Sequence, residues 1–179
     1  MPGEAPVVFS SSYESLRRLL GARLDADFVA KFKAQGVNLD ALQAAYPYEV
    51  WVESLEFTMQ KLWPGVPREE ATYQLGREMF ESFGHTFIGK ALLQMIRVLG
   101  PRRGLERMTR NLRTSNNYAE ARITQTGTTT WELWVNLVAF PHYYRGLITC
   151  GLEHCGAKNP RVEVISHTPN GALVLLVGW

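Results

Sequence analysis

The sequence predicts an α+β fold, in which a helical N-terminal two-thirds packs on a small antiparallel sheet made of two hairpins with an inserted helix. Three observations predict it. Up to about residue 114, apolar residues recur mostly every three or four positions, which is the helical period. Beyond that point, two stretches rich in valine, threonine or tryptophan are each interrupted by turn residues, as hairpins are. One further stretch with helical spacing lies between them.

Start and stop signals divide the helical part. The serines at positions 10–12 are placed to cap a first helix, Asp25 to cap a second, and Gly36 to end it. Within the long stretch 66–100, Gly84 predicts a kink or a division into two helices, because glycine weakens a helix interior. Pro101 suits the first turn of a last helix. The expected helical stretches are 10–24, 25–37, 46–65, 66–100 and 101–114.

The C-terminal third predicts hairpin, helix and hairpin. Thr126 and Gly127 mark the first turn, and Asn170 and Gly171, the strongest turn signal in the chain, mark the second. No repeat, low-complexity run or linker interrupts the sequence. We therefore expect one domain over residues 1–179, mainly helical over 1–114 and hairpin–helix–hairpin over 115–179.

Composition excludes several classes of function. With 19 basic and 17 acidic residues among 179, the chain has no field that would recruit nucleic acid, so we expect no nucleic-acid partner. No window has the roughly 18 apolar residues of a membrane span, and the N-terminus lacks the pattern of a signal peptide. Two cysteines, Cys150 and Cys155, make no disulfide framework. A cytoplasmic location is the expectation.

The stretch 100–114 concentrates arginines on one helix. Arg103, Arg107 and Arg110 share a face, opposite an apolar face with Leu105 and Met108. One interpretation is a solvated face whose charges pair with nearby acids. The alternative is an anion site or a contact with an acidic partner. The candidate contact residues are Arg103, Arg107, Arg110 and Arg113.

Histidines and cysteines give the candidates for chemistry. His85 follows Gly84 in an apolar helix and is the best candidate for contacting a ligand in a pocket, although a satisfied core histidine fits the same pattern. Cys150 and His154 are four residues apart and share a helix face. They are weak metal candidates, because no further ligands are visible at suitable spacing, so no metal is expected. A Cys–His nucleophile pair and a small buried apolar cysteine are the other interpretations.

Three motifs carry a resemblance over the whole chain. "LGREMFESFGHTFIGKAL", "GPRRGLERMTRNLRTSNNY" and "YYRGLITCGLEHCGA" resemble a paralogous family of uncharacterised proteins from myxobacteria. The order of elements resembles the heme-nitric-oxide/oxygen-binding (H-NOX) domain, and the related vinyl-reductase-type and TRAPP folds. The last two imply a pocket between the helical part and the sheet for an apolar molecule or a partner subunit.

The H-NOX resemblance also implies a heme site that these residues do not repeat. Such domains have a proximal histidine on the helix before the first hairpin, but residues 101–114 contain none. They also have a Tyr-x-Ser-x-Arg motif before the inserted helix. Here "PHYYR" keeps Arg145 but has Pro141 and Tyr143 at the other positions. No cofactor is therefore expected, and heme with a non-standard ligand, His85 or His142, is the alternative.

Together these features predict a non-enzymatic sensor or adaptor that binds an apolar small molecule or a protein partner. A homodimer is one form that this hypothesis allows. The alternatives are a heme or porphyrin sensor and an enzyme using Cys150 and His154. The candidate ligand-binding residues are Phe83, His85, Phe87, Trp134 and Tyr144.

Overall fold

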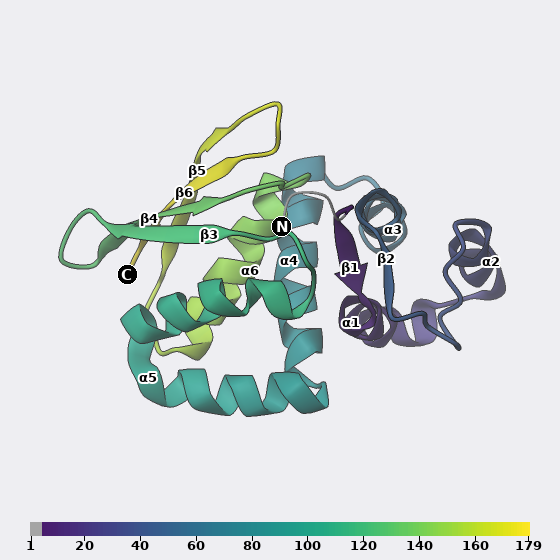
Figure 1. Cartoon of the computed structure of the whole chain (residues 1–179), viewed down its shortest axis with the longest axis horizontal. Coiled ribbons are helices and arrows are strands. Elements are labelled where there is room, and N and C mark those ends of the chain that lie inside the picture. Colours follow the sequence, from purple (N-terminus) through teal and green to yellow (C-terminus); the bar gives the residue numbers. More distant parts are fainter. Residues whose placement is uncertain (1–4) are drawn as a thin grey trace.

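The structure, a computed structural model, describes residues 5–179, except for the side chain of Ile88. Figure 1 shows a sheet at one end of the molecule and the first helices at the other, with two long helices, α4 and α6, between them. The mixed helix and sheet architecture confirms the α+β prediction. Within the described residues, no helix is both long enough and apolar enough to cross a membrane.

The N-terminal part contains three helices and a two-stranded sheet. Its elements are β1 (Val7–Phe9), α1 (Ser10–Leu20), α2 (Ala26–Ala34), β2 (Ala45–Pro47) and α3 (Tyr48–Leu62). Asp25 caps α2 as predicted, since its side chain accepts a hydrogen bond from the amide of Phe28 at 2.9 Å. The predicted serine cap of α1 is wrong: the helix already includes Ser10, and the capping position is Phe9, whose side chain makes no capping bond.

The β1–β2 sheet was not predicted, because strands of three residues are too short to show a regular alternation of apolar and polar residues. The partners of β1 explain why it forms. One edge pairs with β2, and the other meets the segment after the fifth helix, where the amide of Phe9 donates to Ser115 O at 2.8 Å and the amide of Val7 to Asn117 Oδ1 at 2.8 Å.

The long central stretch forms two helices, α4 (Arg68–Gly84) and α5 (Phe87–Asn111), as the glycine at position 84 indicated. Thr86 begins α5, because its hydroxyl accepts a hydrogen bond from the amide of Gly89 at 3.0 Å. Gly100, with a φ of 74°, divides α5 into two limbs, the second starting at Pro101. The bend turns the second limb back beneath the sheet (Figure 1).

The C-terminal third has the predicted order of hairpin, helix and hairpin. Its elements are β3 (Ala121–Gln125), β4 (Thr130–Val135), α6 (Pro141–His154), β5 (Arg161–His167) and β6 (Leu173–Gly178). Both hairpins are antiparallel, and β4 pairs with β6, so the sheet has the order β3-β4-β6-β5. Along β6, Leu173, Leu175 and Val177 are fully buried under the helices.

Helices α4 and α6 cross at glycines. A Cβ atom on Gly76 would lie 2.0 Å from the backbone oxygen of Tyr143, and one on Gly146 would lie 2.1 Å from that of Tyr73. Such distances are far below van der Waals contact, so only glycine permits this separation of the two backbones. The crossing brings the C-terminal half of α4 alongside α6.

The buried apolar residues form two clusters. The first joins the sheet to α6 and α5, with Leu133, Leu152 and Ile96 among its members. The second joins α1, α2 and α3 to α4, and contains Tyr13 and Phe32. Helix α4 contributes to both clusters, so the junction between the clusters runs along this helix.

Candidate functional site

A cavity of about 140 Å³ lies where the two buried clusters meet. Val8 and Trp51 line it from the N-terminal cluster, and Phe80, Met108 and Ile148 line it from the cluster at the sheet. Its wall therefore comes from β1, α3, α4, α5 and α6 together. Pockets of this kind, mostly apolar and placed between packed elements, are the usual location of small-molecule sites.

One side of the cavity is aromatic. Tyr118, Tyr143 and Tyr144 line it, and the rings of Tyr143 and Tyr144 pack edge to face with centroids 5.9 Å apart. Burial raises the pKa of all three phenols, because phenolate loses its hydration in an apolar environment. The three hydroxyls are therefore protonated at neutral pH and can donate hydrogen bonds.

Part of the wall is polar, and it includes Asn116, which lies next to Tyr118. Asn116 is fully used: its Nδ2 donates to Leu112 O at 3.1 Å, and its Oδ1 accepts from the amides of Tyr118 and Ala119 at 3.2 and 2.7 Å. Asn111 also lines the cavity, but its Nδ2 is buried and has no hydrogen-bond partner within residues 5–179. A buried donor without a partner costs free energy, and such groups concentrate at functional sites.

Among the described residues, no charged side chain and no histidine lines this cavity. A buried ion without a partner costs several kcal/mol or more, so the cavity suits a neutral molecule. The polar atoms that it offers come from three phenols, two asparagines and the hydroxyls of Ser12, Ser15, Thr114 and Ser115.

The five predicted ligand residues divide into two groups. Phe83 and Tyr144 line the cavity, together with their neighbours Phe80 and Tyr143. The other three, His85, Phe87 and Trp134, do not.

The physical reasons are local. His85 is exposed because α4 ends at Gly84 and the chain turns away from the core there. Phe87, the first residue of α5, has 92% of its surface exposed. Trp134 lies on β4, away from the cavity, where the guanidinium of Arg122 covers its ring at 4.9 Å. These three side chains therefore do not line this cavity, and their role as ligand contacts stays a prediction.

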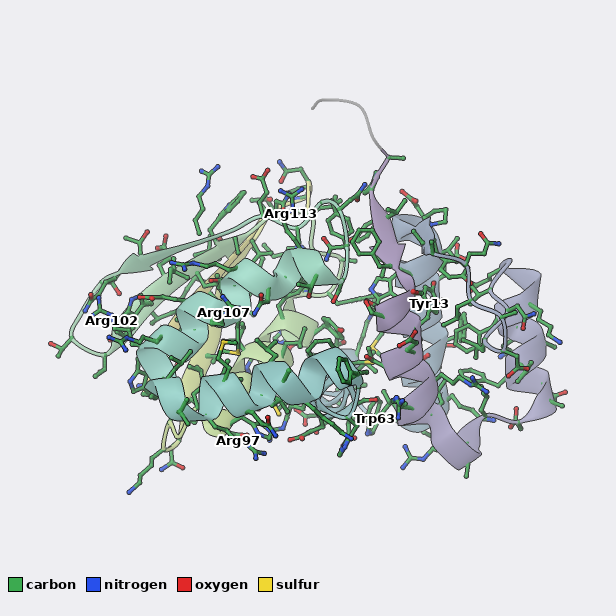
Figure 2. The ribbon with its side chains drawn as sticks, turned by 60° about the horizontal axis from the view of Figure 1, so that its bottom comes forward. Tyr13, Trp63, Arg97, Arg102, Arg107 and Arg113 are labelled. Carbon is green, nitrogen blue, oxygen red and sulfur yellow. The ribbon has the colours of Figure 1, made fainter. Side chains whose placement is uncertain are left out.

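The arginines begin near the end of the first limb of α5 and continue along its second limb and beyond it. Figure 2 shows Arg97 on the first limb, Arg102 near the bend and Arg107 on the second limb. Arg113 follows the helix, and its Nη2 donates to Asn117 O at 3.0 Å.

The predicted arginine face is not neutralised by acids. In the described part of the chain, Arg103, Arg107 and Arg110 form no ion pair, and Arg107 Nε is buried without a hydrogen-bond partner. Arg102, at the bend, pairs with Glu106 at 3.6 Å. The interpretation in which nearby acids pair with this face is therefore wrong for these three arginines.

A second group of polar side chains lies between the C-terminal halves of α4 and α6. His154 Nε2 donates to Glu81 Oε1 at 2.9 Å, and Cys150 Sγ donates to the same oxygen at 3.3 Å. Arg77 pairs with Glu153 beside them at 2.8 Å. Cys150 and His154 were predicted as candidates, but Glu81 was not. Glu81 is 69 positions from Cys150, and the two meet only because α4 and α6 pack closely at their glycines.

The electrostatics of this group disfavour a reactive thiolate. Burial, followed by the charge of Glu81, raises the pKa of Cys150. Burial also acts to raise the pKa of Glu81, but hydrogen bonds from His154 and Cys150 outweigh it, so the pKa of Glu81 is lowered. Because His154 bonds Glu81 and not the sulfur, these residues do not form an activated Cys–His pair.

The other two histidines serve local contacts. His142 Nε2 lies 3.6 Å from Glu69 Oε2, and its buried Nδ1 has no partner in the described part. His167 Nε2 bonds Val138 O at 2.7 Å.

Histidine-ligated heme does not fit this cavity. A macrocycle with two propionates is several times larger than the ring-sized molecules that a cavity of about 150 Å³ accepts. His85 and His142 lie outside the cavity, and no arginine of residues 5–179 lines it to meet a propionate.

Comparison with solved structures finds H-NOX domains. An Fe(II) unliganded H-NOX protein from K. algicida is 9% identical, with a TM-score of 0.62 and 95% of each chain covered. An oxygen-binding H-NOX domain related to soluble guanylate cyclases, solved as its oxygen complex, is 14% identical, with a TM-score of 0.59 and coverage of 94% of this chain and 91% of that one. At these identities the likeness shows the fold alone, and it confirms the predicted resemblance to the H-NOX fold.

Comparison with curated proteins finds no match. The predicted membership of an uncharacterised family is confirmed, whereas the myxobacterial origin stays a prediction. A family model described as "Protein of unknown function (DUF2378)" matches residues 6–179, and the chain therefore belongs to the DUF2378 family.

Proposed function

We propose that the chain is a non-enzymatic sensor that binds one small, neutral, mainly apolar molecule between its two buried clusters. The observation that carries the proposal is the cavity of about 140 Å³, lined by aromatic and aliphatic side chains and by no charged residue of the described chain. An apolar protein cavity of about 150 Å³ accommodates benzene. The size therefore suits a molecule with one ring or a short alkyl chain.

The polar groups specify a hydrogen-bond acceptor on this molecule. Asn111 has an unused amide donor, and Tyr143 and Tyr144 have protonated hydroxyls. The terminal torsion of asparagine is soft, so a small rotation can present the Asn111 amide to a ligand. A ketone, ether or alcohol oxygen would accept that bond, whereas a carboxylate would bring an uncompensated charge.

The position of the cavity supports a sensor. A molecule in it contacts Val8 and Trp51 of one cluster and Phe80 and Ile148 of the other at the same time. Ligand binding favours whichever arrangement of the two clusters fits the ligand better, and such differential affinity is what shifts a conformational equilibrium. Occupancy would thus be read out as a change in packing along α4.

A non-enzymatic function is supported by the state of the best candidate nucleophile. Cys150 is buried, its pKa is raised, and its proton is held by Glu81. A thiol of this kind contains almost no thiolate at neutral pH.

Acetophenone is a suitable probe, because it has one ring and one carbonyl acceptor. We expect calorimetry to show binding to the wild-type protein, and ethylbenzene, which lacks the acceptor, to bind about 2- to 12-fold more weakly, the range of one net hydrogen bond. Leu92→Phe puts a larger side chain into the cavity wall, and it should abolish binding. Val98→Phe, on the same limb of α5 but 83% exposed, is the matched control and should bind normally.

Three results would contradict the proposal. These are equal binding to wild type and Leu92→Phe, tightest binding for benzoate, or a Soret band in the freshly purified protein.

A second candidate function, contact with an acidic protein partner, is favoured by the unpaired arginines. Arg103 and Arg110 are exposed and form no ion pair in the described part of the chain. Poly-glutamate is the probe: its binding should weaken with salt and be lost in Arg103→Ala/Arg110→Ala, but not in the control pair Arg18→Ala/Arg23→Ala.

The homodimer also stays a prediction, which sedimentation equilibrium would test.

A further inference from the structure

Three metal-binding side chains meet between α4 and α6, outside the proposed ligand cavity. Glu81 Oε1 lies 3.3 Å from Cys150 Sγ and 2.9 Å from His154 Nε2, and the three atoms all lie within 4.8 Å of one another. Cys150 and His154 are four residues apart on α6 and so share a face. The glycine crossing at Gly76 and Gly146 brings α4 close enough for Glu81 to complete the set.

The set matches the ligand preference of zinc. Zn²⁺ in proteins binds thiolate, imidazole and carboxylate at about 2.0–2.3 Å, usually with tetrahedral geometry. Two ligands at those lengths and a tetrahedral angle lie about 3.5 Å apart. The distances from Glu81 Oε1 to the other two atoms are each within about 0.6 Å of this separation. Side-chain rotations alone can therefore bring the three atoms around one ion.

The surroundings leave a fourth coordination position accessible. Glu81 and His154 lie on the wall of a surface depression of about 210 Å³, which His85, Lys90 and Arg97 also line. Cys150 is buried below it and takes no part in that lining. An ion among the three ligands would have its open position toward the depression, where water or a small anion can bind beside the two cationic side chains. Structural zinc sites are closed by four protein ligands, whereas this site would keep one exchangeable position for water or a small anion.

We propose that Glu81 Oε1, Cys150 Sγ and His154 Nε2 form a Zn²⁺ site with its fourth position open to the depression. Binding replaces the two hydrogen bonds to Glu81 by metal–ligand bonds. The thiol proton of Cys150 leaves to solvent as the Zn–S bond forms. His154 gives up its proton on Nε2 and carries its ring proton on Nδ1 instead, so the neutral imidazole changes tautomer and releases no net proton. One thiolate and one carboxylate balance the two charges of the ion, so the partly buried site has no net charge.

The first test is titration of reduced, chelator-treated protein with Zn²⁺ against a chromophoric competitor, and with Co²⁺ as a spectroscopic substitute. We expect one ion per chain. The Co²⁺ form should show the ultraviolet charge-transfer band of a Co–thiolate bond and the intense visible bands of tetrahedral cobalt. Calorimetry in buffers of different ionisation enthalpy should show release of about one proton, because the thiol is the group that must deprotonate.

Variants assign the ligands. Cys150→Ala should abolish the charge-transfer band, and Glu81→Gln should weaken Zn²⁺ binding by more than about 100-fold, because even loss of a supporting partner costs about 10–100-fold. Glu81 is half exposed, so the amide variant should fold, and circular dichroism checks this. Cys155→Ala and His142→Asn remove a thiol and an imidazole elsewhere, and should bind as the wild type does.

The proposal fails if the protein takes up no stoichiometric Zn²⁺, if bound Co²⁺ shows no thiolate band, or if Glu81→Gln keeps wild-type affinity. Glu81, Cys150 and His154 would then be a hydrogen-bonded contact between two helices and no more. The small-molecule proposal is unaffected by this outcome, because none of these three residues lines its cavity.

Discussion

Two asparagines in the wall of the same cavity should respond to the same substitution in opposite directions. Asn111 Nδ2 is buried without a partner in the described part of the chain. Leaving a buried donor unpaired costs about 1–3 kcal/mol, and leucine has nearly the same shape as asparagine without the polar atoms. Leucine is also favoured in a helix by a few tenths of a kcal/mol. Asn111→Leu should therefore stabilise the empty protein by about 1–3 kcal/mol.

Asn116→Leu should do the reverse. The change leaves the amides of Tyr118 and Ala119 without an acceptor, whereas Leu112 O still accepts from the amide of Ser115 at 3.4 Å. At about 1 kcal/mol or more for each of the two unpaired amides, the loss is at least about 2 kcal/mol.

Thermal unfolding followed by circular dichroism measures both variants. For a chain of this length, each kcal/mol changes Tm by about 2–4 °C. Asn111→Leu should raise Tm by a few degrees, and Asn116→Leu should lower it by about 4 °C or more. Equal loss of stability in both variants would refute the reasoning, because it would mean that Asn111 is satisfied in solution without a ligand.

Three further outcomes follow from the packing and the buried phenols. Gly146→Ala should lower the free energy of unfolding, measured in urea, by about 1–3 kcal/mol, because the added Cβ would clash with the backbone oxygen of Tyr73. This loss should outweigh the better helix propensity of alanine. The control Glu78→Ala, at an exposed position on α4, should leave the free energy of unfolding nearly unchanged. Burial raises the pKa of Tyr13 and Tyr48 to about 12. The two buried phenols therefore contribute fully to stability below pH 10, and their contribution is lost as the pH rises through 12. In a pH titration, the absorbance of tyrosinate should increase together with unfolding. Phe87→Ser, at an exposed site, should change stability by less than about 0.5 kcal/mol and leave acetophenone affinity unchanged.

The order of the elements could be predicted because its signals are local. The helical period, the Asp25 cap and the turn at Asn170 and Gly171 each act over a few residues, and the structure has all three features. The β1–β2 sheet could not be predicted, because its pairing joins Val7–Phe9 to Ala45–Pro47 across the first helices. Its edge contact with Ser115 spans an even longer separation.

The cavity was predicted only in part for the same reason. Phe83 and Tyr144 were found because aromatic residues at helical spacing favour a buried face. Phe87 follows Phe83 at the same spacing, and His85 follows Gly84 at the end of the apolar helix, but both lie at the junction between α4 and α5, where the chain turns toward solvent. Asn111 carries no such signal, since nothing local distinguishes an unpaired asparagine from the paired one five positions later.

The most direct test of the neutral-ligand cavity is the side-chain amide signal of Asn111 in a ¹⁵N-labelled sample. Acetophenone should shift that signal strongly and saturably, ethylbenzene should bind more weakly and shift it less, and benzoate should leave it unchanged. The three titrations need only one assigned resonance, confirmed by its loss in Asn111→Leu. An unchanged Asn111 signal with acetophenone bound elsewhere, or a shift produced by benzoate alone, would contradict the assignment of this cavity as a site for a neutral acceptor-bearing molecule.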